Sequence, residues 1–439
     1  MATVSFYTLG CKVNQYETEA MLELFKNSGY DVVDFEEAAD IYIINTCTVT
    51  NEADKKSRKI FSKAKKNNPA AIVAAVGCYA QASKEQLKEN KNLDLIIGNN
   101  KKNQIVKILE DYIEEKNINT FVKDMQFEND FEDMEISFSE EKTRAHIKIQ
   151  DGCNQFCSYC IIPITRGRVR SRKPELVLRE IHQLVLNGYK EVVLTGIHMA
   201  SYGVDLKDYR LIDLLEDINQ IEGLARIRLG SLEPTLVNDD FAYRIGRLEK
   251  ICPHFHLSLQ SGCDETLKRM NRKYTTEEYS DAVKRLRNSF SNPSITTDII
   301  VGFPGESEEE FNKTCSFANR IGFADIHIFK YSKRKGTRAA EMNNQVDDMI
   351  KNQRSKELSE VKIELYKNYL ESFIGKTMEV LFEDTIVIKD NKEYIIGHTD
   401  NYLKICVMKK DKAVANKLFN VKITDISNEF LEGDICELT

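Results

Sequence analysis

The chain has 439 residues, of which 42% are hydrophobic and 30% charged, as expected for a soluble globular protein of roughly two to four domains. No run of about 18 apolar residues occurs, and the N-terminus lacks the basic segment of an export signal, so we expect a cytoplasmic protein without a membrane span. The net charge of −7 excludes a surface that binds nucleic acid over its whole area, but it leaves room for a local basic groove.

Residues 1–123 alternate short apolar runs with helical patterns. The apolar runs that predict strands are Val4–Leu9, Ile41–Asn45, Ala71–Val76 and Leu95–Gly98. Each is followed by a segment with helical periodicity, the first of them at Asn14–Asn27. Strand–helix alternation is typical of a parallel sheet with helices on both faces, so we predict an open parallel-sheet domain here.

Residues 124–142 are acidic and lack clear periodicity, which indicates a connector between domains, with a short strand predicted at Ile136–Phe138. From 143 to 373 the strand–helix alternation resumes in longer units. The predicted strands are His146–Gln150, Glu191–Thr195, Arg226–Leu229, His256–Leu259, Thr296–Val301 and His327–Phe329. Six such units predict a partial (β/α)6 barrel.

Residues 374–439 contain short strand patterns separated by turn residues. The predicted strands are Met378–Phe382, Tyr394–Gly397, Leu403–Val407, Val421–Ile426 and Asp434–Leu438. They predict a small all-β, barrel-like domain. The expected fold class is therefore α/β, with an open-sheet domain, a partial barrel and a small β domain in that order.

Three cysteines lie close together just after the first strand predicted for the barrel. Cys153, Cys157 and Cys160 have the spacing C-x3-C-x2-C. Three thiolates can hold three irons of a [4Fe–4S] cube and leave the fourth iron open to a ligand, whereas ferredoxin clusters normally have four cysteines. The alternatives are a zinc site that lacks one ligand, or three unconnected thiols. Zinc motifs pair with a distant second C-x2–4-C, and none follows here.

A second set of cysteines follows three strands of the N-terminal domain. Cys11, Cys47 and Cys78 come directly after the first, second and third predicted strands. Ligands bind beyond the carboxyl ends of strands in an open parallel sheet, so we expect these thiols to converge there on a second three-ligand cluster. The alternative is that each is a small buried hydrophobic residue. With eleven cysteines and no export signal, metal binding is favoured over disulfides.

Both cysteine sets, in this order, resemble the methylthiotransferase family of radical S-adenosylmethionine (SAM) enzymes over essentially the whole chain. The resemblance implies a cluster-binding N-terminal domain over 1–123, a radical SAM domain over 143–373, and a C-terminal domain over 374–439 similar to the RNA-binding TRAM domain. The stretches that resemble the branch acting on N6-threonylcarbamoyladenosine of tRNA are Gln150–Pro163, Arg166–Arg172, Thr195–Gly203 and Tyr331–Thr337. Asn271 departs from the family, in which arginine is more usual.

The resemblance implies two [4Fe–4S] clusters and SAM as cofactors. One SAM donates a methyl group to sulfur at the N-terminal cluster, and a second SAM is split on the Cys153/Cys157/Cys160 cluster. The resulting radical takes hydrogen from C2 of the modified adenine at position 37, in the anticodon stem-loop of tRNA, and the methylthio group is delivered to that carbon. An electron donor such as flavodoxin or ferredoxin is expected.

Other substrates and another class of protein fit the same sequence. The family also includes methylthiotransferases that act on isopentenyladenosine of tRNA or on a ribosomal-protein side chain. A non-catalytic iron–sulfur protein that binds RNA is the alternative from a different class.

Residues near the predicted strand ends are candidates for contact with SAM and RNA. The candidates for SAM are Tyr159, Gly196, Ser231, Glu233, Gln260 and Asp298. Turn geometry explains the glycine equally well, a salt bridge explains Glu233, and packing explains Tyr159. The candidates for RNA phosphate contact are Arg166, Arg168, Arg170 and Arg172, which adjoin the cysteine loop.

Overall fold

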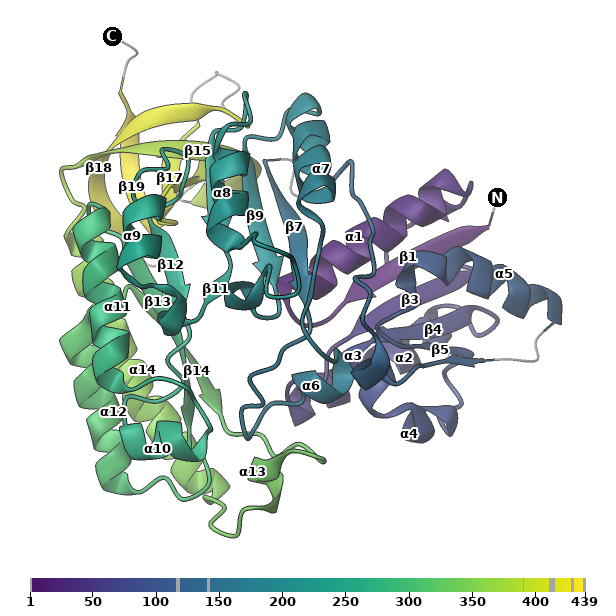
Figure 1. Cartoon of the computed structure of the whole chain (residues 1–439). Helices are drawn as coiled ribbons and strands as arrows, with labels where there is room; N and C mark the ends of the chain where they lie inside the picture. The colour runs from purple at the N-terminus through teal and green to yellow at the C-terminus, as the bar shows by residue number, and fades with distance from the viewer. Residues whose placement is uncertain are drawn as a thin grey trace.

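The computed structural model describes residues 2–115, 119–139, 143–389, 391–409, 415–427 and 430–436. Parts of two predicted segments, residues 140–142 of the connector and 437–438 of the last strand, lie outside the described residues. The predicted fold class is confirmed: an open parallel sheet, a partial barrel of parallel strands and a closed β-barrel follow one another along the chain (Figure 1). Within the described residues, no helix is both long and apolar enough to cross a membrane.

The N-terminal sheet has six parallel strands in the order β2-β1-β3-β4-β5-β6. They are β1 (Thr3–Thr8), β2 (Asp31–Val32), β3 (Ile41–Thr46), β4 (Ile72–Gly77), β5 (Leu95–Ile97) and β6 (Thr120–Phe121). The helices are α1 (Lys12–Asn27), α2 (Asn51–Asn67), α3 (Cys78–Ala82), α4 (Lys84–Lys88) and α5 (Ile105–Glu115), with the 3-10 turn η1 (Lys102–Gln104).

Each face of this sheet is covered by helices, because its central strands are apolar on both sides. Along β3, Ile43 packs with Phe25 of α1 and Ile105 of α5. Its neighbour Ile44 points to the opposite face and packs with Phe61 of α2. This alternation produces two separate hydrophobic cores, one on each face of the sheet.

The connector has no strand at Ile136–Phe138, so that prediction is wrong; its described part holds only the 3-10 turn η2 (Met125–Phe127). Carboxylates take the place of a neighbouring strand. The backbone N–H of Ile136 donates to Glu180 (2.7 Å), and that of Ser137 donates to Glu23 (2.8 Å). The connector is thereby fixed between α1 and α7 (Pro174–Leu186) without pairing in a sheet.

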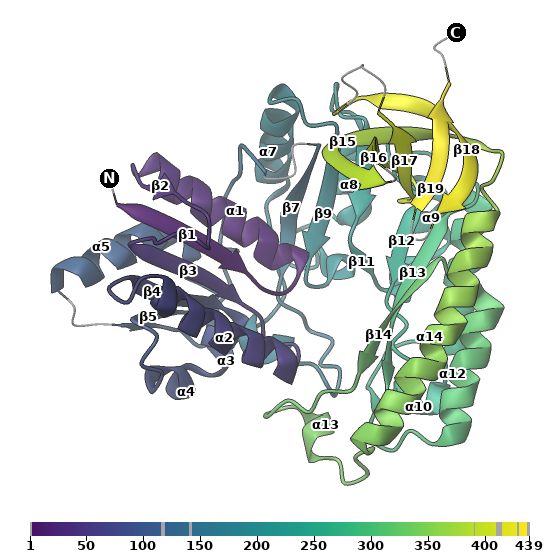
Figure 2. The same cartoon turned by 180° about the vertical axis from the view of Figure 1, so that it is seen from behind.

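The partial barrel consists of two four-stranded sheets, ordered β10-β9-β7-β8 and β11-β12-β13-β14 (Figures 1 and 2). The strands are β7 (Arg144–Asp151), β8 (Arg170–Ser171), β9 (Glu191–Gly196), β10 (Arg226–Leu229), β11 (Ser231–Leu232), β12 (His254–Leu257), β13 (Ser294–Val301) and β14 (Asp325–Lys330). All pair in parallel except β8, which is antiparallel to β7. In the described part of the chain no pairing joins the end strands β8 and β14, so the barrel is open between them.

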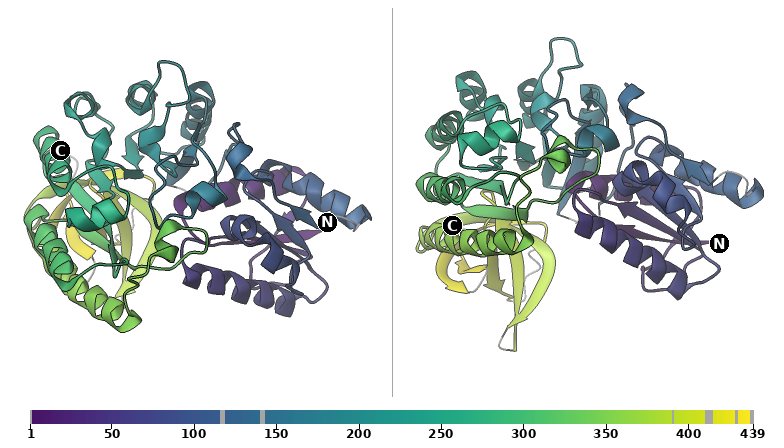
Figure 3. Two further views of the ribbon diagram at one scale, coloured as in Figure 1. Left: turned by 60° about the horizontal axis from the view of Figure 1, so that its bottom comes forward. Right: turned by 90° about the horizontal axis from the view of Figure 1, so that it is seen from below.

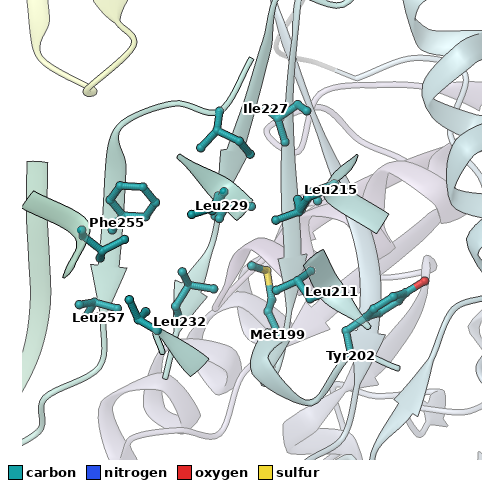
Figure 4. Packing of buried hydrophobic residues seen from close by; sticks show 14 of the residues in the cluster. Met199, Tyr202, Leu211, Leu215, Ile227, Leu229, Leu232, Phe255 and Leu257 are labelled. Atoms are coloured by element: carbon teal, nitrogen blue, oxygen red, sulfur yellow. The ribbon is translucent and has the colours of Figure 1, made fainter. Parts of the chain in front are cut away.

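Helices cover the outside of the partial barrel (Figure 3). Besides α7 they are α8 (Leu211–Asn219), α9 (Asp239–Ile245), α10 (Asp264–Arg269), α11 (Thr276–Ser289), α12 (Glu308–Ile321) and α14 (Asp348–Glu371), with short α6 (Ile162–Thr165) and α13 (Arg338–Glu341) and the 3-10 turns η3 (Met199–Ser201) and η4 (Pro234–Leu236). Figure 4 shows part of the core where the two sheets meet, including Leu229 of β10, Phe255 of β12, Met199 and Leu211.

The C-terminal strands close into a barrel in the order β15-β16-β17-β19-β18. They are β15 (Thr377–Lys389), β16 (Lys392–Thr399), β17 (Lys404–Met408), β18 (Leu418–Ser427) and β19 (Phe430–Ile435). This small barrel, yellow in Figures 1 and 2, sits against the amino-terminal ends of the strands of the partial barrel. Arg226 at the start of β10 donates to the carbonyl of His398 (2.9 Å) across this contact.

Candidate active site

Cys11, Cys47 and Cys78 lie at the carboxyl ends of three neighbouring strands. Cys11 precedes the first residue of α1, Cys47 follows β3, and Cys78 is the first residue of α3. Gly10 makes the close approach possible: it has a φ of +109°, and a Cβ there would lie 2.8 Å from Cβ of Cys47. The structure therefore brings these three predicted residues to one edge of the sheet.

The three thiols are close enough to influence one another. Burial, followed by the neighbouring Cys78 and Cys11, raises the pKa of Cys47 to about 12. Asn99 donates to Sγ of Cys78 (3.5 Å), and Sγ of Cys11 lies 3.8 Å from Oδ1 of Asn14. Buried thiols that raise one another's pKa favour a bound cation, because a metal site binds the thiolate form.

Cys153, Cys157 and Cys160 lie in the loop between β7 and α6. Gly152 starts the loop with a φ of +72°, and a Cβ there would come within 1.8 Å of the carbonyl oxygen of Arg168. The backbone N–H of Cys160 donates to the carbonyl of Cys157 (3.0 Å), which closes a tight turn. Burial raises the pKa of Cys160 to about 12 and that of Cys153 to about 11.

The guanidinium of Arg272 accompanies this loop. Its Nη1 lies 3.2 Å from Sγ of Cys157, and its Nη2 donates to Glu233 (2.7 Å). Arg272 therefore links this sulfur to the buried carboxylate of Glu233. Asn271, the departure from the family pattern, donates to the carbonyl of Phe156 (2.9 Å) in the same loop.

The spacing of the sulfurs fits a cluster better than a single ion. Among the described residues, ligand atoms of three groups lie within 4.8 Å of one another only at His256, Asp298 and His327 and at Cys263, Glu265 and Glu310. Neither cysteine set is as tight as that. Zinc bound at about 2.3 Å from each sulfur would need its sulfurs about 4 Å apart. As they are placed, neither set could therefore hold one zinc ion through all three of its sulfurs.

A cavity of about 240 Å³ lies beside the Cys153/Cys157/Cys160 loop. Three of the residues predicted to contact SAM, namely Tyr159, Gln260 and Asp298, line it together with Cys160. The rings of Phe329 and Tyr331 also line it, and Tyr159 packs edge-on against Phe303. The contact of these side chains with SAM remains a prediction.

The other three residues predicted to contact SAM do not line this cavity. Glu233 forms a buried ion pair with Arg272, and its second oxygen lies 3.3 Å from Nε2 of His198. Gly196 packs against Gln150, and Ser231 lines a different, larger cavity.

The larger cavity has a volume of about 920 Å³ and lies inside the partial barrel. It is lined by residues of β7, β9, β10, β12, β13 and β14, by Cys11 and Lys12 of the N-terminal domain, and by Asn401 and Tyr402 of the C-terminal barrel. Asp298 and Phe329 line both cavities. The larger cavity thus reaches from the N-terminal cysteine set to the wall that it shares with the smaller one.

The predicted contact of the arginine run with RNA is wrong for three of its four residues. Arg166, Arg170 and Arg172 are buried, with side-chain exposures of 0%, 3% and 0%. Arg172 pairs with Glu180, and Arg170 donates to the carbonyls of Arg166 (2.9 Å) and Arg168 (2.8 Å). Guanidiniums held inside the protein cannot reach a phosphate. Arg168 is exposed and lies over the ring of Phe156. Of the four arginines, it is the one whose contact with RNA stays a prediction.

Arg166 instead reaches into the N-terminal domain. It pairs with Glu17 (2.9 Å) and Asp151 (3.1 Å), and it donates to Oδ1 of Asn14 (2.7 Å). The side-chain amide of Asn99 donates to the backbone carbonyl of the neighbouring Thr165 (2.8 Å).

Asn14 and Asn99 therefore each join a cysteine of the N-terminal set to the segment that follows the other set. Our sequence analysis missed both residues. Asn14 is three residues after Cys11 on the first turn of α1, which was the only available signal.

Comparison with known proteins finds one family model that matches the N-terminal domain and another that matches the partial barrel. The model of "Uncharacterized protein family UPF0004" matches residues 3–98, and that of the "Radical SAM superfamily" matches residues 147–318. A relative from Bacillus subtilis named "Threonylcarbamoyladenosine tRNA methylthiotransferase MtaB" is 42% identical over 99% of this chain and 96% of its own length. A relative of the same name from Aquifex aeolicus is 41% identical over 92% of this chain and 96% of its own.

A second kind of relative is more distant. The "tRNA-2-methylthio-N(6)-dimethylallyladenosine synthase" of Thermoanaerobacter pseudethanolicus is 35% identical over 98% of this chain and 92% of its own length. Among solved structures, the radical SAM methyltransferase TsrM from Kitasatospora setae, with cobalamin and a [4Fe-4S] cluster bound, matches with a TM-score of 0.56 at 15% identity. It covers 77% of each chain, and at this identity the likeness shows the fold alone.

Proposed function

This chain belongs to the radical SAM methylthiotransferase family, and on that premise we propose that it converts N6-threonylcarbamoyladenosine at position 37 of tRNA to its 2-methylthio derivative. One observation carries the proposal. Two three-cysteine sets face two cavities that share Asp298 as a wall, with Cys11 lining the larger cavity and Cys160 the smaller. A nucleoside in the larger cavity would therefore have sulfur chemistry on one side and SAM on the other.

The cofactors are SAM and [4Fe–4S] clusters, and their cysteine ligands are part of the proposal. Cys153, Cys157 and Cys160 would hold the cluster that binds SAM, and the N-terminal set would hold the second cluster. When bound, these groups supply the one-electron chemistry that an unreactive aromatic C–H bond requires, and the sulfur that replaces its hydrogen.

The side chains of this protein would bind and orient the substrate and SAM, and they would exclude water from the site. His256 and His327 each place a ring nitrogen 3.3 Å from Oδ1 of Asp298, which fixes that carboxylate in the shared wall. Phe303 lies between Tyr159 and Tyr331, with ring centroids 6.3 and 5.5 Å away. These rings keep the smaller cavity apolar on one side and shield a reactive species from water.

The proposed partners are the tRNA substrate and a protein that donates the electron. The tRNA substrate is supported by the names of relatives that match almost the whole chain. We propose further that the anticodon stem-loop is the part bound, that exposed Arg168 contacts its phosphates, that flavodoxin or ferredoxin donates the electron, and that the protein works in the cytoplasm.

A second candidate substrate is dimethylallyladenosine of tRNA, favoured only by the relatives at 35% identity. The threonylcarbamoyladenosine enzymes of Bacillus subtilis and Aquifex aeolicus are 42% and 41% identical to this chain, which supports the first proposal. A non-catalytic iron–sulfur protein that binds RNA is disfavoured because the relatives that match almost the whole chain are named as methylthiotransferases.

Nucleoside mass spectrometry of tRNA from a strain that lacks this protein tests the proposed function. We expect the 2-methylthio form of N6-threonylcarbamoyladenosine to disappear and its unmodified precursor to accumulate. The wild-type protein should restore the modification, and the Cys157→Ala variant should not. Persistence of that modification, or loss of 2-methylthio-dimethylallyladenosine in its place, would overturn the proposal.

A further inference from the structure

Most charged side chains in the wall of the larger cavity are neutralised by neighbours. Arg228 pairs with the buried carboxylate of Glu191 (2.7 Å), and Arg144 lies 3.5 Å from the same carboxylate. His327 lies between two carboxylates, 3.3 Å from Asp298 and 3.5 Å from Asp325. These side chains hold one another in place, so they have little capacity left for a charged ligand.

Two other histidines of the cavity, His146 and His254, are neutral near pH 7. Burial lowers the pKa of His146 to about 3, and it holds the pKa of His254 well below its usual range. They therefore offer polar surface but no positive charge to a substrate.

Lys12 is the exception in this wall. It is the first residue of α1, it follows Cys11 directly, and it lines the cavity. Its ammonium donates only to the side-chain oxygen of Gln15, at 3.3 Å, and it forms no ion pair with any described residue. Its charge also contributes to the lowered pKa of His146 on β7, which indicates that it acts on the interior of the cavity.

The chemistry of the proposed substrate supplies the missing anion. A threonylcarbamoyl group on N6 ends in a free carboxylate, whereas a dimethylallyl group is apolar. In adenine, N6 and C2 lie on either side of N1, so a substituent on N6 lies at the edge of the base that must face the sulfur donor. With C2 directed toward the N-terminal cysteine set, the carboxylate comes to the same side of the cavity as Lys12, whose four-carbon stem gives it reach.

We propose that Lys12 is a specificity-determining residue whose ammonium binds the carboxylate of the threonylcarbamoyl group. The inference rests on the proposed function and deepens it, because it names the chemical feature by which the substrate is selected. A charge-assisted contact of this kind rewards the acid and leaves an apolar N6 substituent with an unpaired ammonium to desolvate.

The test compares two synthetic anticodon stem-loops that differ in one group. One carries N6-threonylcarbamoyladenosine, and the other carries its threoninamide analogue, in which a neutral carboxamide replaces the carboxylate. Methylthio product is measured with the reconstituted two-cluster protein. For the wild type we expect kcat/KM to be about ten-fold or more higher for the acid than for the amide. In the Lys12→Met variant that ratio should fall toward one, and Lys12→Arg should restore most of it.

Lys26→Met is the matched control, because Lys26 is an exposed lysine at the other end of the same helix. It should keep the wild-type ratio of acid to amide. Iron content and 5′-deoxyadenosine formation report whether each variant retains its clusters. Equal use of acid and amide by the wild type overturns the proposal even if Lys12→Met assembles poorly.

The possible failures are distinguishable. A wild-type protein that modifies neither stem-loop contradicts the proposed function itself. A wild type that prefers the acid, with a ratio unchanged in Lys12→Met, retains the proposed function and overturns the role of Lys12. Equal losses on acid and amide in Lys12→Met would mean that Lys12 contacts a phosphate, and this result also overturns the inference.

Discussion

Arg166 brings a positive charge into the interior of the protein, where Glu17 and Asp151 neutralise it. Its side chain is fully buried. Removing one partner from a buried ionic network leaves the remaining charges without compensation, which typically costs about 3–5 kcal/mol. We therefore expect Arg166→Met to lower the thermal midpoint of the anaerobically purified protein by roughly 5–10 °C.

Arg168→Met is the control for this prediction, because Arg168 lies two residues away and is exposed. Its guanidinium lies over the ring of Phe156 in a cation–π contact. Its loss should shift the midpoint by no more than about 2–4 °C. Similar shifts for both variants would contradict a structural role specific to Arg166.

A second prediction at the residue scale concerns pH. Hydrogen bonds to Asp298 and then to Asp325 raise the pKa of His327 to about 9, above the ordinary value of 6.5. A raised folded-state pKa stabilises the protein fully below pH 6.5, and this contribution is lost as the pH rises through 9. His327→Gln should therefore destabilise the protein most near pH 6 and progressively less toward pH 9.5.

Thermal midpoints of wild type and variant across that pH range give the measurement. His182→Gln, which changes an exposed histidine on α7, serves as the control and should show no such trend. If the difference in thermal midpoint between wild type and His327→Gln stayed constant or grew with pH, the proposed ionic contribution would be excluded. The side chain of His327 is 52% exposed, so the effect is expected to be modest.

At the scale of elements, two asparagines connect the edge of the N-terminal sheet to the segment after the other cysteine loop. Asn99 contacts Sγ of Cys78 and the carbonyl of Thr165, and its side-chain oxygen accepts from Lys102 (2.8 Å). Because these contacts fix one cysteine set relative to the other, we expect Asn99→Ala to impair sulfur transfer more than SAM cleavage. The ratio of methylthio product to 5′-deoxyadenosine should fall by about ten-fold.

Asn100→Ala provides a neighbouring control, since Asn100 donates to Glu128 (3.2 Å) and, within the described part of the chain, makes no hydrogen bond to a cysteine of either set. It should keep the wild-type ratio. If Asn99→Ala reduced product and SAM cleavage in equal proportion, the asparagine would have a general structural role and the coupling argument would fail.

The elements also show which features the sequence could predict. Cys47 and Cys78 directly follow apolar strands, so their common edge follows from local pattern and the topology of parallel sheets. The role of Arg166 could not be predicted, because its partner Glu17 is 149 residues away in the sequence. The prediction of a strand at Ile136–Phe138 was wrong for a similar reason, because carboxylates distant in sequence accept the hydrogen bonds of the backbone N–H groups in this segment.

On the scale of the whole molecule, the C-terminal barrel closes one end of the larger cavity. Arg228 donates to the carbonyl of Asp400 (2.8 Å), and its guanidinium lies 4.6 Å from the ring of Tyr402, which lines the cavity. The sequence predicted this β domain from its strands but gave no sign of its docking, since the contact joins residues 172 apart. The domain that resembles an RNA-binding module therefore also forms part of the cavity wall.

The two cysteine sets, placed on different domains, should be separable by mutation. The reconstituted wild type is expected to contain about eight irons per chain, as two cubes require, and both Cys157→Ala and Cys47→Ala about four. Cys157→Ala should form no 5′-deoxyadenosine, because the cluster that binds SAM is lost. Cys47→Ala should still form it but yield no methylthio product, because only the second cluster is lost.

Cys436→Ala, a change in the C-terminal barrel outside both sets, controls for the loss of any thiol and should keep about eight irons and both activities. Iron analysis, 5′-deoxyadenosine and methylthio nucleoside are measured on the same samples. A Cys47→Ala protein that retained four irons but cleaved no SAM would show that the sets do not act separately. The division of labour would then have to be abandoned, because SAM cleavage would depend on the N-terminal domain as well as on the barrel.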